Sequence, residues 1–384
     1  MRVSHVITRL IVGGAQENTV STAVGLSKIP GVQVDLVSGP SGGSEGTLED
    51  FVKAAGVPLH IIPHLVRPVR PWSDFAALGE LTSHYKRIRP DVVHTHSGKA
   101  GILGRLAAKQ AGVPIIIHTI HGPSFGPFQG PAANFVFRAA EKYAAQFTTH
   151  FSVVAEAMAE QYMAAGIGEP SDYTLIFSGF NLDPFLCAGN DPALRARYGI
   201  APEDIVIGKI ARLFELKGHE DLFAAAAELV RAVPNAKFLL VGDGPLRARF
   251  ERLVSELGLK DRVVFTGLVS PAEIPALVGI MDMLVHLSLR EGLPRALPQA
   301  LAAGKPVVAY DCDGAREVCV TGKTGFLIAP RDLNGLKAAV QQLCGDPQVR
   351  DTLGAAGREF VRARFSVEKM VADTHALYER LGAR

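Results

Sequence analysis

The stretch MLVHLSLREGLPRALPQALAAGKPVVAY, residues 283–310, contains two short apolar runs on either side of a loop and a helical pattern. The two runs predict strands over Met283–His286 and Pro306–Tyr310, and the residues between them predict a helix over Arg295–Ala303. Strands that alternate with helices in this way form a parallel sheet with helices on both faces.

The same alternation extends through the whole chain. In the first half we predict strands at Val3–Ile7, Val32–Val37, Pro58–Ile62, Val92–Thr95, Ile115–Thr119 and Phe151–Val154, and helices at Ala15–Leu26, Leu78–Arg89, Ala100–Ala111 and Phe135–Ala145. In the second half we predict further strands at Ile205–Ala211, Lys237–Val241, Val263–Thr266 and Gly325–Ile328, and helices at Glu220–Ala232, Pro245–Leu257 and Ala272–Gly279. The fold class is therefore α/β, with two parallel sheets.

The chain divides where its composition changes. Its 384 residues suit two domains of about 150–200 residues each. The segment FNLDPFLCAGNDPALRARYGIAPED, residues 180–204, is rich in Pro, Gly, Asn and Asp and predicts a linker. We expect one Rossmann-like domain over residues 1–182 and a second over residues 193–364. The helical pattern of Phe365–Leu381 predicts a C-terminal helix within residues 365–384 that packs back on the first domain.

Composition excludes several classes of protein. Hydrophobic residues make up 48% and charged residues 20%, as in globular proteins. A net charge of +2 gives no reason to expect nucleic acid as a partner. The four cysteines form no C-x-x-C pair, which is typical of reduced residues in a cytoplasmic protein. The apolar N-terminal run reads as a first strand, and no apolar stretch reaches the roughly 20 residues of a membrane span.

Gly13 and Gly14 follow the first predicted strand and precede the first predicted helix. Glycines there let backbone N–H groups approach a ligand, and the positive end of a helix favours a phosphate at the same place. A tight turn without a ligand is the alternative. The loop is not the G-x-G-x-x-G dinucleotide pattern, which argues against an oxidoreductase.

Arg212 and Lys217 follow the strand predicted at the start of the second half. Ligands of open α/β sheets bind at the carboxyl ends of strands, and two cations there can neutralise a diphosphate without a metal. A pair of solvated surface cations is the alternative.

Glu291 lies in a Gly-Pro loop between a strand and a helix. A carboxylate in that place can accept hydrogen bonds from sugar hydroxyls, and the alternative is an acid that caps the following helix. The neighbouring pair Asp311 and Asp313 resembles a metal-binding acidic pair, but it follows a strand and begins a turn, so we interpret it as turn chemistry.

Four histidines, His94, His96, His118 and His121, occur near the ends of two strands. Their spacing differs from zinc sites, and a strand alternates its side chains, so we do not expect all four to converge. We interpret one of the four as a sugar contact in preference to a metal site, and His94 and His118 as structural residues.

Together these residues resemble the retaining glycosyltransferases of GT-B fold, family 4 (glycosyltransferase group 1), of the exopolysaccharide and lipopolysaccharide type. The resemblance covers nearly the whole chain and depends on the runs GGAQ, VVHTHSGKAGILGRLAA, IIIHTIHG, IARLFELKGHEDL, LLVGDGPL, VVFTGLV, SLREGLPRALPQALAAGKPVVAYDCDGAREV and GKTGFLI. It implies two facing Rossmann-like domains with an interdomain cleft that closes on the substrate.

The resemblance also implies a nucleotide diphosphate sugar donor, UDP more than GDP, and no required metal or cofactor. His121 and Glu291 would be catalytic, with His121 touching the transferred sugar and Glu291 holding its ring. Further donor contacts are implied for Gly13, Gly14, Arg212, Lys217, Val269, Gly292, Leu293, Arg295 and Gln299.

Two positions depart from the family pattern. The second acid of the Glu-x7-Glu motif is Gln299, which can accept from a ribose hydroxyl but loses a charge-assisted bond commonly contributing about 1 kcal/mol or more. Pro294 removes a backbone N–H from the donor loop. These departures keep a catalytically silent nucleotide-sugar-binding protein open as an alternative, and a nucleotide-sugar epimerase of GT-B fold is another.

The acceptor is expected to be a carbohydrate or a lipid-linked sugar. Between Lys53 and Lys142 the bases outnumber the acids, so the first domain can rest on an anionic membrane surface at the inner face. Phe125 and Phe128, in the loop Pro123–Pro131, are expected to contact the acceptor or lipid. The alternative is a solvated surface balanced by acids elsewhere.

Arg295 is predicted to supply a positive charge in place of the backbone N–H that is missing at Pro294. An Arg295→Ala variant should therefore raise the KM for the nucleotide sugar. Steady-state kinetics with varied donor concentration measure this, and an unchanged donor KM would refute the role.

Overall fold

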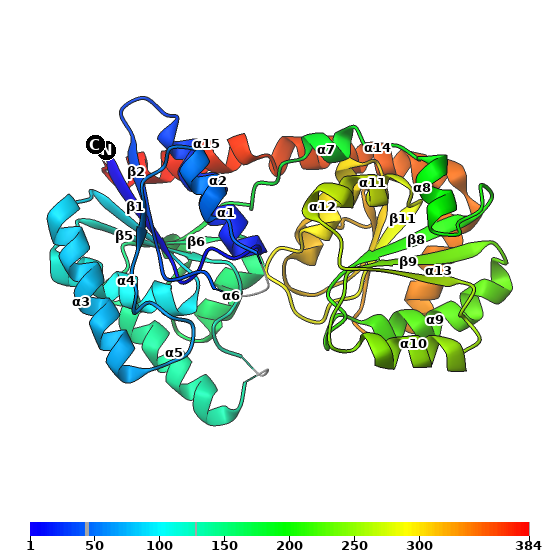
Figure 1. The fold of residues 1–384 in the computed structure, drawn as a ribbon, viewed down its shortest axis with the longest axis horizontal. Helices are drawn as coiled ribbons and strands as arrows, with labels where there is room; N and C mark the ends of the chain where they lie inside the picture. The colour runs from blue at the N-terminus through cyan, green and yellow to red at the C-terminus, as the bar shows by residue number, and fades with distance from the viewer. Residues whose placement is uncertain (43–45, 127–128, 384) are drawn as a thin grey trace. The chain divides into compact units, whose positions relative to one another are not determined.

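The computed structural model describes residues 1–42, 46–126 and 129–383. The chain folds into two compact units (Figure 1). The first contains Met1–Gly179 together with Val367–Arg384, and the second contains Phe180–Ser366. Among the described residues, no helix is both long enough and apolar enough to cross a bilayer.

The first unit is built on a seven-stranded parallel sheet in the order β3-β2-β1-β4-β5-β6-β7. Its strands are β1 Arg2–Ile7, β2 Gln33–Ser38, β3 Leu59–Ile61, β4 Val92–His96, β5 Ile115–Ile120, β6 His150–Val153 and β7 Tyr173–Leu175. Its helices are α1 Gly14–Ser27, α2 Glu49–Ala54, α3 Pro71–Ile88, α4 Gly98–Ala111, α5 Pro131–Ala145, α6 Glu156–Ala164, the 3-10 turn η1 Pro170–Asp172, and α15 Val367–Arg380.

Helices cover both faces of this sheet, so its central strands are buried along their whole length. β5, with the sequence IIIHTI, is buried at all six positions. Such continuous burial explains why the sequence lacks polar alternation there. On one face α1 and α15 pack against β1, β4 and β5, and on the other face α3 and α4 pack against the same strands.

The second unit repeats the plan with a six-stranded parallel sheet in the order β10-β9-β8-β11-β12-β13. Its strands are β8 Ile205–Ile210, β9 Ala236–Val241, β10 Val263–Gly267, β11 Met283–His286, β12 Val307–Tyr310 and β13 Gly325–Ile328. Its helices are α7 Asp183–Leu186, α8 Pro192–Arg197, α9 His219–Ala232, α10 Arg247–Glu256, α11 Ile274–Gly279, α12 Ala296–Ala302, α13 Leu333–Gly345 and α14 Pro347–Arg364, with 3-10 turns η2 Pro271–Glu273 and η3 Asp313–Glu317.

The linker predicted over residues 180–204 is wrong. That segment forms α7 and α8 and packs within the second unit. The buried guanidinium of Arg195 donates a hydrogen bond to the carbonyl of Ile280, at 3.4 Å, and an added Cβ at Gly279 would lie 2.3 Å from the carbonyl oxygen of Gly189. Two prolines of the segment begin α7 and α8, so the composition that suggested a linker belongs to helix starts and turns that these tertiary contacts hold in place.

The end of the chain returns to the first unit through α15. Gly25 of α1 faces Val371 of α15 so closely that an added Cβ would lie 2.3 Å from the valine Cγ2. Met370, Leu377 and Tyr378 of α15 belong to the same apolar cluster as Val3. α15 is therefore part of the core of this unit.

A side chain at Gly25 should weaken the docking of α15. Because the site has no free volume, we expect Gly25→Leu to lower the free energy of unfolding by about 1–3 kcal/mol. Gly79→Leu is the control, since Gly79 lies on the exposed face of α3 with no atom within 4 Å of an added Cβ. Urea unfolding of both variants measures the difference, and equal losses at the two positions would contradict this packing.

Candidate active site

The second unit has a point where the order of its strands reverses. β8 and β11 are neighbours there, β9 and β10 lie on one side, and β12 and β13 lie on the other. Loops that leave the carboxyl ends of two such strands separate in opposite directions and leave room for a ligand. The loop after β8 carries Arg212 and Lys217, and the loop after β11 carries Glu291.

Backbone contacts tie these two loops together. The N–H of Leu289 donates to the carbonyl of Leu216 at 2.8 Å. Gly218 has φ 65°, and a Cβ there would lie 2.1 Å from the carbonyl oxygen of Leu287. Only glycine allows this approach, so Gly218 is the residue that lets the Lys217 segment lie against the loop after β11.

Lys217 and Glu291 form an ion pair. Nζ of Lys217 lies 2.5 Å from Oε1 of Glu291, and the two side chains are 26% and 20% exposed. Burial alone would raise the pKa of Glu291, but the contact with His286, whose Nε2 lies 3.4 Å from Oε1, and the charge and hydrogen bond of Lys217 outweigh burial and hold the pKa well below its usual range. The backbone N–H of Glu291 donates to Oδ2 of Asp313 at 2.7 Å. The carboxylate is therefore ionised and fixed in place.

Lys209 is a second lysine in this region to which the sequence pattern assigned no role. It lies in β8, is 2% exposed, and burial together with the charge of Lys217 lowers its pKa to about 7. A buried ammonium is costly unless an anion approaches it. The sequence around Lys209 gave no indication that this side chain is buried.

Arg212 extends from the loop after β8 and is exposed. Its guanidinium carbon lies 5.7 Å from the ring centre of Phe214. The loop after β9 supports this segment, because added Cβ atoms at Gly242 and Gly244 would lie 2.3 and 2.4 Å from the carbonyl oxygens of Ala211 and Leu213. The Gly-Asp-Gly sequence is thus a structural support for the arginine loop.

Four of the other predicted donor contacts of this unit lie in the loop after β11 or in α12, and the fifth lies in the loop after β10. Gly292 accepts a hydrogen bond from the N–H of Gly314 at 3.0 Å, and Leu293 is buried. Arg295 lies with its guanidinium carbon 5.9 Å from the ring of Phe180, and Gln299 is half-buried in α12. Val269 is half-buried in the loop after β10.

The acidic pair near these loops forms turn contacts. Asp311 accepts two hydrogen bonds from Arg316, at 2.9 and 3.1 Å, and Asp313 accepts the backbone N–H of Glu291. Both carboxylates thus have partners within the protein, which agrees with the interpretation of the pair as turn chemistry.

In the first unit the strand order reverses between β1 and β4. Gly13 and Gly14 follow β1, and Gly14 is the first residue of α1. Gly13 has an extended backbone, with φ 178°, and its carbonyl accepts the N–H of Glu17 at 2.9 Å. An added Cβ at Gly13 would meet only the side-chain amide of Gln16, at 2.7 Å, and this flexible side chain can move away.

As predicted, the four histidines of the first unit do not all converge, although three of them gather. His94 and His96 project from the same face of β4, and His121 follows β5. A histidine that sequence reasoning missed, His5 of β1, pairs in register with His94. His118 points to the opposite face, where its Nδ1 lies 2.8 Å from the hydroxyl of Thr95. His5 had no recognisable role in the sequence, because only the register of β1 and β4 shows which histidines it contacts.

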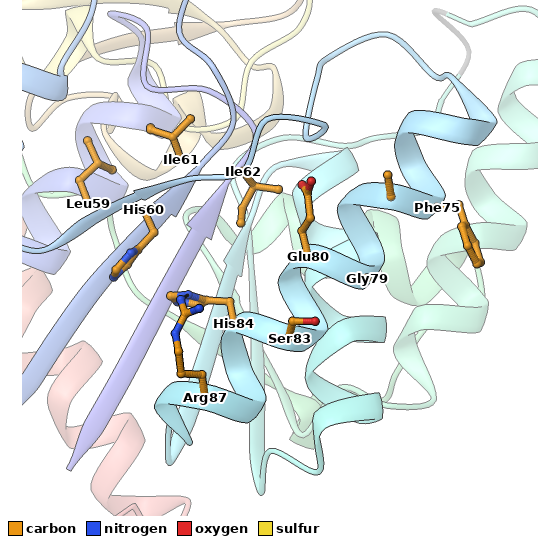
Figure 2. A pocket seen from close by; sticks show the side chains of 11 residues that line it. Leu59, His60, Ile61, Ile62, Phe75, Gly79, Glu80, Ser83, His84 and Arg87 are labelled. Carbon is orange, nitrogen blue, oxygen red and sulfur yellow. Dashed lines mark hydrogen bonds between the residues drawn. The ribbon is translucent and has the colours of Figure 1, made fainter.

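A separate hollow of about 730 Å³ lies in the first unit between β3 and α3. Figure 2 shows His60 from β3 on one side and His84 and Arg87 from α3 on the other. Asp35 lies 3.0 Å from Nε2 of His84, and Arg87 donates to Nδ1 of the same ring at 3.0 Å. Of the described residues that line the hollow, none is a predicted site residue.

Potential metal ligands gather twice among the described residues. Asp35, His60 and His84 form one group, and His5, His94 and His96 form the other, with their ligand atoms within 4.8 Å of one another. In the second group each nitrogen already faces a polar partner within the protein.

Two family models match the chain. Residues 190–360 match the model for glycosyl transferases group 1, and residues 13–177 match the model for the glycosyl transferase 4-like domain. Among relatives, the UDP-Gal:alpha-D-GlcNAc-diphosphoundecaprenol alpha-1,3-galactosyltransferase of Escherichia coli is 28% identical over 98% of this chain and 96% of its own. The 2-deoxystreptamine glucosyltransferase of Streptomyces kanamyceticus is 32% identical over 80% of this chain and 81% of its own.

Solved structures share the fold. The crystal structure of Anabaena Alr3699/HepE in complex with UDP and glucose has a TM-score of 0.83 and 22% identity, and covers 99% of this chain and 100% of that one. Together with the two parallel-sheet α/β units, this similarity confirms the predicted GT-B fold class.

The buried histidines make stability depend on pH. Burial lowers the pKa of His5 to about 3 and that of His121 to about 4, whereas an unfolded histidine titrates near 6.5. Below pH 6.5 the unfolded chain therefore binds more protons than the folded one, and each such histidine lowers the free energy of unfolding by about 1.4 kcal/mol per pH unit.

We expect the free energy of unfolding to fall steeply between pH 6.5 and 5, by about 2 kcal/mol for His5 alone. Glu291 does not contribute in that window, because its stabilising charge is lost only at lower pH. Urea unfolding at pH 7.5, 6.5, 5.5 and 5 measures the slope. A free energy that stays constant across this range would show that the histidines are not held neutral.

Proposed function

The chain belongs to the group 1 glycosyl transferases, and from this premise we propose that it moves a sugar from a UDP-sugar to a lipid-linked or polysaccharide-precursor acceptor, with retention of the anomeric configuration. That the chain is a glycosyltransferase is the prediction that its relatives confirm. The observation that supports the placement of the donor is the ion pair of Lys217 and Glu291 where the strand order of the second unit reverses.

The donor diphosphate is assigned to the cations of the loop after β8. The side chain of Lys217 is 26% exposed, and Arg212 is exposed, so both can reach a phosphate oxygen. UDP is proposed because the Escherichia coli relative is named for UDP-Gal and the Anabaena structure contains UDP. GDP is the competing nucleotide, since other relatives are named as GDP-mannose-dependent.

Glu291 is assigned to the transferred sugar. An ionised carboxylate accepts hydrogen bonds and donates none, so it suits hydroxyl groups and repels a phosphate. Lys217 neutralises this carboxylate in the ligand-free protein. When a diphosphate takes over the ammonium, Glu291 is released to bind the hydroxyls. The ion pair thus holds both groups ready without an uncompensated charge.

The proposed reaction places negative charge on the departing diphosphate and positive charge on the sugar carbon. Arg212 and Lys217 stabilise the diphosphate, which makes a metal unnecessary in this proposal. The acceptor oxygen attacks from the face that the diphosphate leaves, and a phosphate oxygen takes the proton of the acceptor. Retention at the sugar carbon follows from attack on that face.

The remaining site residues keep the roles that the family resemblance implies. We propose His121 as a contact of the transferred sugar, and Gly13 and Gly14 as backbone contacts of the diphosphate at the start of α1. The further donor contacts proposed in the second unit are Val269, Gly292, Leu293, Arg295 and Gln299.

The acceptor is proposed to be lipid-linked, because the Escherichia coli relative is named for a diphosphoundecaprenol acceptor. The first unit offers a surface for an anionic bilayer before and within the start of α3. Val69, Trp72 and Phe75 are 67%, 89% and 75% exposed there, and the nearby arginines at 67 and 70 are exposed as well. Exposed aromatic groups beside arginines are typical of proteins that rest on membranes. Phe125 of the expected acceptor loop is buried, and Phe128 lies outside the described residues.

Two variants separate donor binding from transfer. Lys217→Met should weaken UDP binding about 10-fold or more, because it removes a charge-assisted bond to phosphate. Glu291→Gln should leave UDP affinity within about threefold but lower transfer about 100-fold, because its contact is with the sugar. Lys260→Met is the control, since Lys260 is exposed at the amino-end edge of the same sheet. Calorimetry with UDP and release of UDP from UDP-galactose measure the two effects.

The donor and acceptor are identified by the same assay with UDP-galactose, UDP-glucose, UDP-N-acetylglucosamine and GDP-mannose, each with a polyprenyl diphosphate sugar in anionic vesicles. Transfer of one sugar to the lipid, with an unchanged anomeric configuration by NMR, is expected. Conversion of the donor without an acceptor would favour an epimerase. Binding of UDP without any release of UDP from a sugar nucleotide would favour a silent binding protein.

A further inference from the structure

The buried imidazoles of the first unit form a continuous chain that ends at His121. Nδ1 of His5 lies 2.9 Å from Nε2 of His96, and Nδ1 of His96 lies 3.0 Å from Nε2 of His121. At the other end, the hydroxyl of Tyr378 lies 3.4 Å from Nε2 of His5. The same hydroxyl lies 2.5 Å from Nδ1 of His94.

Neutral histidines satisfy every contact in this row of imidazoles. Each nitrogen-to-nitrogen contact needs one N–H donor and one lone pair, and a neutral imidazole has one of each. If His5 or His96 became an imidazolium, both of its nitrogens would donate, and a neighbouring histidine would have to change its tautomer. Desolvation acts in the same direction, since burial lowers the pKa of His5 to about 3 and also lowers that of His96.

Tyr378 sets the donor–acceptor direction of the hydrogen bonds along this row of histidines. Its hydroxyl has one proton, which we assign to the short contact with His94, so its oxygen accepts from Nε2–H of His5 at the longer distance. His94 can then donate through Nε2 to the hydroxyl of Thr119, at 2.6 Å. Both histidines that touch the tyrosine are satisfied by this single choice.

The remaining protons follow from that choice. Nδ1 of His5 must accept, so His96 donates through Nε2, and Nδ1 of His96 must accept in turn. His121 therefore donates through Nε2 and keeps an unprotonated Nδ1. The ring of His121 is half-buried, and its Nδ1 has no hydrogen-bond partner among the described residues.

We propose that Tyr378, His5 and His96 are positioning residues that hold His121 in its neutral Nε2–H form, so that Nδ1 of His121 accepts a hydrogen bond from a hydroxyl of the donor sugar. The opposite form would present an N–H and would favour an anion or a carbonyl. The hydroxyl of a C-terminal helix thus selects the chemical class of group that His121 binds. This inference rests on the proposed function for the identity of the substrate.

A metal site at the same residues is the competing explanation. Three of these histidines bring potential ligand atoms within 4.8 Å of one another. A metal ion would need three lone pairs directed at one point, and the assigned chain uses the lone pairs of His5 and His96 to accept N–H groups. The hydrogen-bonded histidines and a metal site therefore predict different responses of the histidine NMR signals when zinc is added.

The tautomers are measured directly on the wild-type protein by long-range proton–nitrogen NMR with nitrogen-15 histidine at pH 7.5. Comparison with the spectrum of His121→Gln identifies the resonances of His121. We expect His5, His96 and His121 to be neutral and protonated at Nε2. An imidazolium, an Nδ1–H form of His121, or large shifts of these signals on addition of zinc chloride would overturn the proposal. This measurement needs no turnover, so it stands even if no sugar is transferred.

The kinetic consequence is measured with Tyr378→Phe, which removes the hydroxyl that sets the direction. We expect kcat with UDP-galactose to fall about 5-fold or more, the Kd of UDP to change less than about twofold, and the NMR signals of His121 to show a mixture of forms. Tyr173→Phe is the matched control, because it loses a hydroxyl bond of the same 2.5 Å length, to the carbonyl of Ile167.

An unchanged kcat in Tyr378→Phe, or an equal loss in Tyr173→Phe, would overturn the role of Tyr378 while the proposed function stands. If Tyr378→Phe does not fold, the wild-type NMR measurement decides alone. If the wild type transfers no sugar from any nucleotide donor but shows the expected tautomers, the proposed function fails. The positioning of His121 by Tyr378, His5 and His96 still stands in that case.

Discussion

The contact between the ammonium of Lys217 and the carboxylate of Glu291 depends on one feature of the second unit, the reversal of strand order between β8 and β11. Parallel strands bring all their carboxyl ends to one edge of a sheet, and at the reversal the loops after β8 and β11 begin at neighbouring strands and leave room for a ligand between them. Gly218 then lets the loop after β8 lie against Leu287 at the end of β11. The charged pair is thus a consequence of topology and of one glycine.

The first unit uses the same topology with different chemistry. Its reversal lies between β1 and β4, and it gathers neutral imidazoles instead of charges. Burial that would be costly for a lysine or a glutamate costs a neutral histidine little, provided that each nitrogen has a partner. The core therefore carries a polar chain from Tyr378 in α15 to His121 at the carboxyl end of β5.

The two sheets could be predicted from the sequence because their strands are short buried apolar runs, and β11 and β13 have the predicted bounds. The sequence indicated Lys217 and Glu291 as charged residues in loops after strands. It could not show that these two residues, 74 positions apart, form an ion pair. His5 carried no local signal, because only the register of β1 and β4 gives it partners. The segment 180–204 was misread because composition shows turns and not the contacts that fix them.

We expect Lys217 to leave Glu291 when it binds the diphosphate of the donor. A crystal structure of the protein with bound UDP measures both contacts. A phosphate oxygen should lie within hydrogen-bond distance of Nζ of Lys217, and this Nζ should lie farther than 2.5 Å from Oε1 of Glu291. UDP bound with the ion pair intact, and with its phosphates away from the loop after β8, would show that Lys217 does not hold the diphosphate.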